Sequence, residues 1–362
     1  MTTRMKETMT DRERIEAMLK GEKPDRVPVW PFDYSAFAVA NARYDFTTIY
    51  DHPDKALEIQ QWCCEQYGWV FVPTFGFASY GGWEFGGEIK WPSGEFAQAP
   101  NVARHPVETE EDVWNLKKPE VSTAGIIPLM TEFNKIGAAE QLDNEPFNVL
   151  AWGLGAFNTA GMIASVDKMC KWVIKKPDVA KRLLRLAADH SIDLADYWYK
   201  LFGVKGVLPF TGEAVATGQI ISAKQFEEFV LPYFIEVHNH ILSLGYKHIY
   251  CHQCGEQNAN LEHWAKIPYG KPGIISIGHE VELETAGKYY PNDIIMGNLE
   301  PAIIQSQTPD NVYEATKKNI LDGMTKCPGG YVFSPGCELP PMAPVENIKA
   351  MNQAVADYGW YD

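Results

Sequence analysis

The sequence predicts an α/β fold of the (β/α)8 or TIM-barrel type, built from the whole chain of 362 residues. Three observations predict it. Eight short apolar runs recur along the chain, helical stretches lie between most of them, and no internal repeat or low-complexity linker divides the chain. Short buried strands that alternate with helices are typical of a parallel barrel. We therefore expect residues 1–362 to form a single domain.

The first expected element is an N-terminal helical extension in TDRERIEAMLKG. Thr10 or Asp11 can serve as its N-cap, and Gly21 ends it. The eight strands are then expected at Val27–Phe32, Trp69–Thr74, Phe147–Gly153, Gly206–Glu213, His248–Cys254, Gly273–Glu280, Asp293–Glu300 and Tyr331–Cys337. Proline in the first and fourth runs argues against regular central strands at these two places.

Helices and one insertion fill the gaps between the runs. Helical stretches are expected at Ser222–Gly245 and at Thr308–Met324, and the second opens with the helix-start pair Thr-Pro. The long gap after the second strand contains Phe77–Phe96, which is rich in glycine and aromatic residues. We expect a hairpin insertion there, near the mouth of the barrel.

The charge balance excludes some classes of function. The formal net charge is −15 and the isoelectric point is near 5.1. Nucleic acids and anionic membranes need clustered Lys and Arg, so neither is an expected partner. No apolar run reaches the ~18 residues of a transmembrane helix, and the charged N-terminus has no signal-like core. A cytoplasmic location is expected, where the seven cysteines are thiols or metal ligands.

The stretch YCHQCGE, residues 250–256, places one histidine and two cysteines at the end of a predicted strand. Active sites of these barrels lie at the carboxyl ends of the strands. His252 and Cys254 are two positions apart, so they share one face while Cys251 faces away. Zinc accepts imidazole and thiolate, and a catalytic zinc keeps three protein ligands and one open position.

Cys337 is the candidate third ligand, because SPGCELPP places it at the end of the last strand. Two alternatives to a zinc site stay open from spacing alone. Buried cysteines are often only small apolar residues. A redox pair of Cys251 and Cys254 is less favoured, because strand alternation separates their side chains and no thioredoxin-like context surrounds them.

Four segments carry a family resemblance: DRERIEAMLKGEKPDRVPVW, HQCGE, MGNLEPAIIQSQTPDNVYEATKKNI and SPGCELPPMAPVENIKAM. They resemble the uroporphyrinogen decarboxylase superfamily, and more closely its corrinoid-dependent methyltransferase branch. The resemblance runs from about Thr10 to Met351. It implies a (β/α)8 barrel and a zinc ion held by His252, Cys254 and Cys337. It also implies a corrinoid carried by a partner protein, since the chain has no D-x-H-x-x-G cobalamin signature of its own.

Two alternatives within this resemblance are less favoured. The decarboxylase carries a pair of arginines after its first strand and an aspartate after its second. Neither is present here, since Pro28–Val39 has no arginine and Val70–Gly82 has no aspartate. A catalytically silent module that binds a corrinoid protein is the remaining non-enzyme alternative.

The favoured activity is O-demethylation, in which a methoxylated aromatic compound gives its methyl group to cobalt(I). Aromatic residues near the first strand, among them Trp30, Phe32 and Tyr34, either pack in the core or form the substrate pocket. The alternative is a methylcobalamin:thiol methyltransferase of the coenzyme M type. Its sulfonate needs a cationic group, and the arginines Arg43 and Arg104 do not lie at predicted strand ends.

Four further strand-end residues are candidates. Glu213 and Glu280 are expected to act as a fourth zinc ligand or as proton carriers, unless they are merely solvated carboxylates. His279 and Asn298 are expected to bind substrate or orient a ligand, or to be turn residues. A small methylated substrate and a corrinoid protein are the expected partners, and a homodimer is compatible with the sequence.

Overall fold

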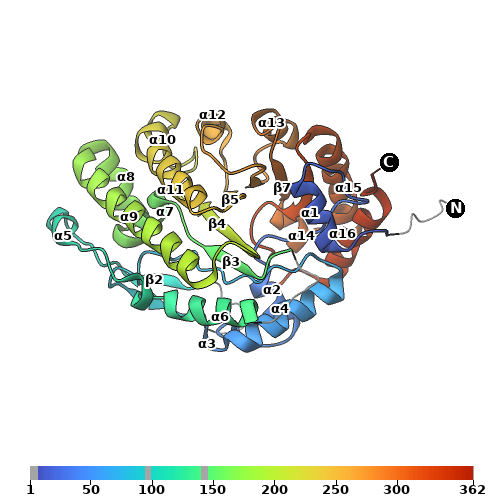
Figure 1. Cartoon of the computed structure of the whole chain (residues 1–362), viewed down its shortest axis with the longest axis horizontal. Helices are drawn as coiled ribbons and strands as arrows, with labels where there is room; N and C mark the ends of the chain where they lie inside the picture. Colours follow the sequence, from blue (N-terminus) through green and yellow to red (C-terminus); the bar gives the residue numbers. More distant parts are fainter. Residues whose placement is uncertain (1–6, 94–98, 140–145, 362) are drawn as a thin grey trace.

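A parallel sheet forms the centre of the molecule. The computed structural model describes residues 7–93, 99–139 and 146–361, and in it six strands pair in chain order. They are β3 (Val149–Trp152), β4 (Val207–Glu213), β5 (Tyr250–Gln253), β6 (Ile274–Ile277), β7 (Ile294–Leu299) and β8 (Tyr331–Pro335). Every residue of these strands is buried, as expected for a parallel sheet covered by helices (Figure 1).

The first two predicted strands, Val27–Phe32 and Trp69–Thr74, are extended segments rather than regular strands. The first lies beside β8, where the backbone of Phe333 exchanges two hydrogen bonds of 3.0 Å with it. The second lies beside the first, because Val70 N–H donates to it over 2.8 Å. Both segments contain proline, which removes N–H donors from a ladder. The irregular first segment agrees with the expectation drawn from its proline, whereas the regular strand predicted for the second is wrong; both segments continue the order of the sheet beyond β8.

Proline does not disrupt the fourth predicted strand. β4 pairs with β3 through Val207–Phe210, whereas its pairing with β5 begins only at Phe210. Pro209 thus lies before the β4–β5 ladder starts, and that ladder does not need its missing N–H. The site-bearing strands β4 and β5 are consequently in regular register.

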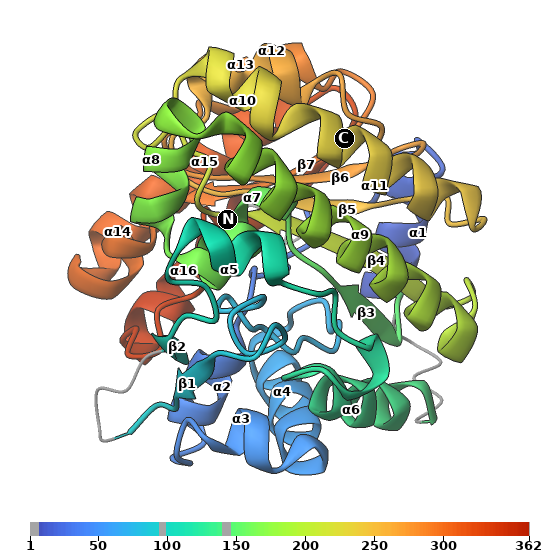
Figure 2. The ribbon, with the colours of Figure 1, turned by 90° about the vertical axis from the view of Figure 1, so that its left-hand side faces the viewer.

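Helices surround the sheet. In the described part of the chain they are α1 (Asp11–Leu19), α2 (Ser35–Asn41), α3 (Thr48–Asp51), α4 (Pro53–Tyr67), α5 (Glu110–Asn115), α6 (Ile127–Ala139), α7 (Ala156–Ala164), α8 (Val166–Lys175), α9 (Pro177–Phe202), α10 (Ala223–Phe229), α11 (Leu231–Ser243), α12 (Leu261–Trp264), α13 (Leu283–Tyr289), α14 (Pro301–Ser306), α15 (Pro309–Lys326) and α16 (Val345–Tyr358), with 3-10 turns η1 (Val121–Thr123) and η2 (Asn258–Asn260). Figure 2 shows the long helix α9 running beside α11 on the outside of the sheet.

The expected helix starts are confirmed. Thr10 caps α1 in a reciprocal capping box with Glu13, and Gly21 follows its end with φ 76°. Thr308 caps α15, where its side chain accepts a hydrogen bond from the Asn311 backbone. These local signals need no tertiary contact, which explains why they are readable in the sequence.

The helix predicted at Ser222–Gly245 is divided into α10 and α11. The break falls at Val230, and Pro232 occupies the first turn of α11. Proline has no N–H to continue the hydrogen bonds of the preceding helix and is well suited to a first turn. One predicted helix is therefore two.

The hairpin insertion lies further along the chain than predicted. β1 (Glu88–Lys90) pairs antiparallel with β2 (Asn101–Arg104), while residues 78–86 form turns. Within these turns Gly81 has φ 109°, and an added Cβ would lie 2.6 Å from the carbonyl oxygen of Thr159. Phe96, the end of the predicted range, is outside the described residues.

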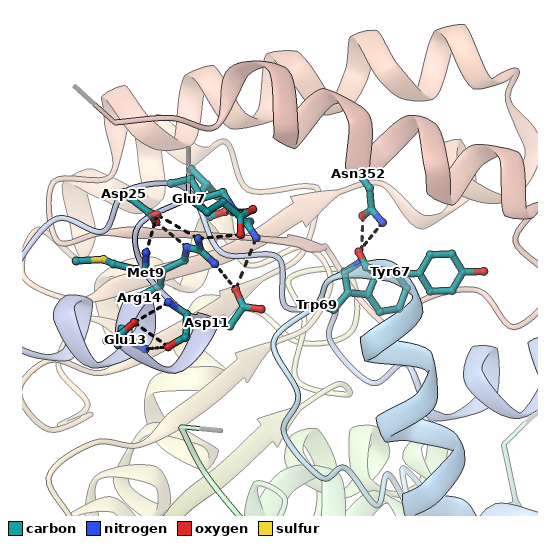
Figure 3. A network of polar contacts seen from close by, with 12 residues as sticks. Glu7, Met9, Asp11, Glu13, Arg14, Asp25, Tyr67, Trp69 and Asn352 are labelled. Atoms are coloured by element: carbon teal, nitrogen blue, oxygen red, sulfur yellow. Dashed lines mark hydrogen bonds and ion pairs between the residues drawn. The ribbon is translucent and has the colours of Figure 1, made fainter. Parts of the chain in front are cut away.

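The helical extension α1 is attached to the start of the first barrel segment. Arg14 is buried, and its guanidinium donates to Asp25 over 2.7 Å and to Asp11 over 2.8 Å (Figure 3). Nearby, Asn352 of α16 accepts a hydrogen bond from the indole of Trp69. These contacts hold the two ends of the described chain against the barrel. Among the described residues, no helix is long and apolar enough to cross a membrane.

Candidate metal centre

Three side chains converge at the carboxyl ends of β5 and β8. One ligand atom each of His252, Cys254 and Cys337 lies within 4.8 Å of the other two. The two sulfur atoms are 3.7 Å apart. Two sulfurs bound tetrahedrally to one zinc at ~2.3 Å lie roughly 3.8 Å from each other. The sequence-predicted trio is therefore assembled, with the sulfur spacing of a tetrahedral metal site.

The ring of His252 is held in a fixed orientation. Its Nδ1 lies 2.8 Å from Ser276 Oγ, and the ring stacks on Phe32 with 4.0 Å between centroids. Its Nε2 is buried and has no hydrogen-bond partner among the described residues. An unpartnered buried nitrogen is costly unless a ligand occupies it. With Nδ1–H donating to Ser276, Nε2 presents a lone pair to the cluster, the arrangement that metal-ligating histidines show.

Local backbone geometry places the two cysteines. Cys254 follows β5, and its N–H donates to the carbonyl of Glu213 over 3.1 Å. Cys337 follows β8 after Gly336, whose N–H donates to the carbonyl of Leu299 over 2.8 Å. An added Cβ at Gly336 would lie 2.7 Å from the backbone nitrogen of His279, so only glycine lets this turn approach β6.

The cluster favours a thiolate on Cys337. The hydrogen bond with Cys254 lowers the pKa of Cys337 well below its ordinary value, and His252 acts in the same direction against the effect of burial. The same contact raises the pKa of Cys254. Thiolates are the form in which cysteines bind metals. All seven cysteines are free thiols, and Cys251 is fully buried outside the cluster, so no Cys251–Cys254 pair forms.

Glu213, predicted as a ligand or proton carrier, is bound by backbone donors at the ends of β3 and β4. Its carboxylate is fully buried and accepts hydrogen bonds from the backbone N–H groups of Asn158, Val215 and Ala216. Burial raises the pKa of Glu213 to about 7. These bonds use both oxygens to fix the loops that follow β3 and β4. Glu213 is also not part of the ligand cluster.

Glu280 lies near the ligand cluster, close enough for its charge to act on Cys254. Its Oε2 is buried and has no hydrogen bond among the described residues, although it lies 3.4 Å from His279 Nδ1. An added Cβ at Gly278 would meet this oxygen at 2.5 Å and the backbone of Gly255 at 2.9 Å. The carboxylate therefore lies over the ends of β5 and β6, and its charge raises the pKa of Cys254.

His279 and Asn298 have different positions. His279 is on the rim, with 39% of its side chain exposed, and its Nε2 is 4.0 Å from Glu300. Asn298 is buried, and its amide donates to the carbonyls of Gly278 and Val281. Asn298 therefore ties the ends of β6 and β7 together, and its amide hydrogens are already used, which disagrees with the predicted contact to substrate.

The expected aromatic pocket is not formed by the residues predicted for it. Trp30 is buried in the core against Tyr250, and Tyr34 is fully buried with its hydroxyl donating to the carbonyl of Val72. Of the three, only Phe32 touches the site, through His252. Trp30 and Tyr34 therefore follow the core-packing alternative, Trp30 from the first barrel segment and Tyr34 from the N-cap of α2.

Three residues of the site were missed. Ser276 orients His252. The sequence feature that could have identified Ser276 is its place on β6, the strand next to β5. Asp33 and Glu338 line a cavity of about 320 Å³. Asp33 directly follows the first barrel segment and Glu338 directly follows Cys337. Both positions fit the rule that barrel sites lie after strand ends.

In parallel-barrel enzymes the active site lies at the carboxyl ends of the strands, and the reactive side chains of this chain gather there. The family model described as uroporphyrinogen decarboxylase (URO-D) matches residues 10–358. The chain belongs to this family, as the sequence resemblance predicts.

The relatives of the chain are named as two kinds of enzyme, methyltransferases and decarboxylases. Over 275 residues the chain is 28% identical to the methylcobamide:CoM methyltransferase MtbA of Methanosarcina acetivorans, covering 76% of each chain. It is 23% identical to a uroporphyrinogen decarboxylase of Geotalea daltonii, covering 72% of this chain and 74% of that one. The solved structure of a methyltransferase from Methanosarcina mazei matches with a TM-score of 0.78 at 22% identity, covering 97% of this chain and 99% of that one. This last match confirms the barrel fold.

Proposed function

We propose that this protein is a zinc-dependent methyltransferase, which moves a methyl group between the cobalt of a corrinoid on a partner protein and the sulfur of a small thiol. The observation that carries the proposal is the convergence of His252 Nε2, which is buried and has no hydrogen bond within the described part of the chain, with two sulfur atoms 3.7 Å apart. A relative named as a methylcobamide:CoM methyltransferase supports the same chemistry.

The residues of the chain have separate tasks in this proposal. His252, Cys254 and Cys337 hold the zinc and leave one position open, and Ser276 keeps the histidine ring in place. Zinc supplies Lewis-acid chemistry, which lowers the pKa of a thiol at the open position. Glu280 Oε2, which has no hydrogen bond of its own, accepts the proton that the substrate thiol releases.

The transfer balances without an added oxidant or reductant. A carbon–sulfur bond forms from the electron pair of the substrate sulfur, and the carbon–cobalt bond breaks. The electron pair of the broken bond stays on cobalt, which becomes cobalt(I). The reverse reaction demethylates a methyl thioether.

O-demethylation of a methoxylated aromatic compound has less support. Trp30 and Tyr34, on which the expectation partly rested, are buried in the core. The relatives include a methylated-thiol–coenzyme M methyltransferase of Methanosarcina mazei, 27% identical over 55% of this chain and 50% of that one. Decarboxylation is disfavoured by the absence of arginine between Pro28 and Val39.

The test combines a metal measurement with a paired assay. Purified protein should contain about one zinc per chain. It should then convert methylcobalamin and a thiol into cobalt(I) corrinoid and a methyl thioether, followed by methyl-cobalt absorbance. A parallel reaction offers cobalt(I) corrinoid and methoxyarenes. Transfer from the methoxyarenes alone would replace the thiol proposal with O-demethylation, and a metal-free protein inactive in both reactions would contradict both.

A further inference from the structure

A cavity of about 320 Å³ is lined by two acidic residues, Asp33 and Glu338, that are chain neighbours of residues at the metal cluster. Glu338, in its wall, directly follows Cys337, and Asp33, in the same wall, directly follows Phe32, which stacks on His252. The volume is at the lower end of the range for small-molecule sites. The position and the size indicate the place where the body of a small substrate lies when its reacting atom is at the cluster.

The charge of this cavity is one-sided. Asp33 and Glu338 line the same cavity, and none of its described lining residues is Lys, Arg or His. Two carboxylates in a partly buried wall repel each other, and either a proton on one of them or a cation bound between them relieves the repulsion.

The partners of the two carboxylates also differ. Asp33 accepts a hydrogen bond of 2.6 Å from Ser35 Oγ. The carboxylate of Glu338 has no hydrogen bond among the residues that the structure describes, although the backbone of Glu338 bonds Cys337. A half-buried carboxylate that faces a cavity and lacks a partner is a binding group for a ligand that brings a donor or a positive charge.

Aromatic rings form another part of the wall. Phe46 and Tyr50 line the cavity beside Ile49, and the Tyr50 hydroxyl donates to the carbonyl of Gly76 over 3.3 Å. Aromatic faces attract organic cations, and quaternary and methylated ammonium groups are recognised in this way. Carboxylates and rings in one cavity therefore favour the same kind of ligand.

We infer that the substrate bound beside the metal cluster is a small organic cation that carries its reacting sulfur and an ammonium group in one short molecule. The inference rests on the proposed thiol methyl transfer and names its substrate class. A sulfonate in this cavity would face two carboxylates without a described cation, so the cavity disfavours the coenzyme M named for the relatives.

The test uses three thiols of equal length that differ in charge. They are 2-aminoethanethiol, 2-mercaptoethanol and 2-mercaptoethanesulfonate, each assayed with methylcobalamin and the zinc-loaded protein. We expect kcat/KM to fall in that order, with a total ratio of roughly 10- to 100-fold for one charge opposite a partly buried carboxylate. The three S-methyl products have no acidic S–H group. Their binding, measured by calorimetry with and without zinc, therefore compares the three charges without differences in thiol acidity.

Isosteric variants identify the groups responsible. In the double variant Asp33→Asn, Glu338→Gln the preference for the ammonium compound should collapse by ~10-fold or more, in turnover and in calorimetry. Asparagine tolerates the positive φ of 33° at position 33, so the fold should be retained. Glu262→Gln is the matched control, because its side chain is 77% exposed on α12.

The outcomes separate this inference from the proposed function. If the sulfonate is preferred, or if all three thiols react equally, the cationic substrate is wrong while thiol methyl transfer stands. If no thiol is methylated, the proposed function fails, and the calorimetry then decides whether the cavity binds cations. A charge preference that the double variant leaves unchanged would also overturn the assignment to Asp33 and Glu338.

Discussion

Cys254 and Cys337 are 83 positions apart in the chain, yet their sulfur atoms lie 3.7 Å from each other. They follow β5 and β8, which are not neighbours, because β6 and β7 pair between them. The contact therefore crosses the mouth of the barrel. Only a curved parallel sheet, with all its carboxyl ends on one side, can bring these two positions together.

Replacing Cys337 with serine should remove the metal and the activity. Serine is a poor zinc ligand at neutral pH, so two strong ligands remain. The loss of zinc affinity should exceed the ~10- to 100-fold that changes outside the ligand shell cost. Zinc content and methyl transfer measure the effect. Cys170→Ser, at a half-buried cysteine on α8, is the control and should retain both. Full zinc in the Cys337 variant would contradict the three-ligand site.

Replacing Ser276 with alanine should weaken zinc binding without emptying the site. His252 Nδ1 would lose its 2.8 Å contact, and the ring would no longer be fixed in the ligating orientation. We expect zinc affinity to fall by ~10- to 100-fold, measured by competition with a chelator. Ser243→Ala, where an exposed hydroxyl donates to the carbonyl of His240, provides the comparison. Equal affinities in the two variants would show that Ser276 has no role in orientation.

Replacement by glutamine should reduce activity at Glu280 and stability at Glu213. Glu280→Gln removes the proposed proton acceptor, so methyl transfer should fall by ~100-fold or more while zinc content is retained. Glu213→Gln places an NH2 group against backbone donors, which should cost about 1–3 kcal/mol of stability. Its melting temperature should drop and its zinc content should be unchanged. A stable Glu213 variant without zinc would restore Glu213 as a ligand.

His190 should make the protein sensitive to acid. Burial lowers the pKa of His190 to about 4, and its Nε2 lies 2.8 Å from the Tyr80 hydroxyl. The unfolded chain binds this proton near pH 6.5, so stability is fully present above that pH and is lost as the pH falls toward 4. The contribution is on the order of 3 kcal/mol.

The measurement is the melting temperature between pH 8 and pH 4. His190→Gln should flatten the fall below pH 6.5, since glutamine does not titrate and still bonds the tyrosine. His52→Gln, at an exposed histidine, should leave the curve as in the unchanged protein. Parallel curves for all three proteins would exclude His190 as the source of the acid sensitivity.

The sequence by itself determined the features that arise from local chemistry and from one clear periodicity. Thr10 and Thr308 predict helix starts because capping uses neighbouring residues alone. The recurring apolar runs predict the barrel, and the barrel places strand ends at the site. The spacing of His252 and Cys254, with Cys337 at the last strand end, made the three residues candidates for one site, and the family resemblance selected a zinc site over structural thiols.

Only the tertiary structure decided how each polar or aromatic side chain is used. Glu213 and Glu280 are both strand-end glutamates, but backbone donors from two loops bind the first, whereas Oε2 of the second has no hydrogen bond among the described residues. Trp30 faces the core while Asp33, three positions later, faces a cavity. These differences depend on groups that come from distant parts of the chain. No local pattern encodes them, because burial and hydrogen-bond partners are set by the packing of the closed barrel.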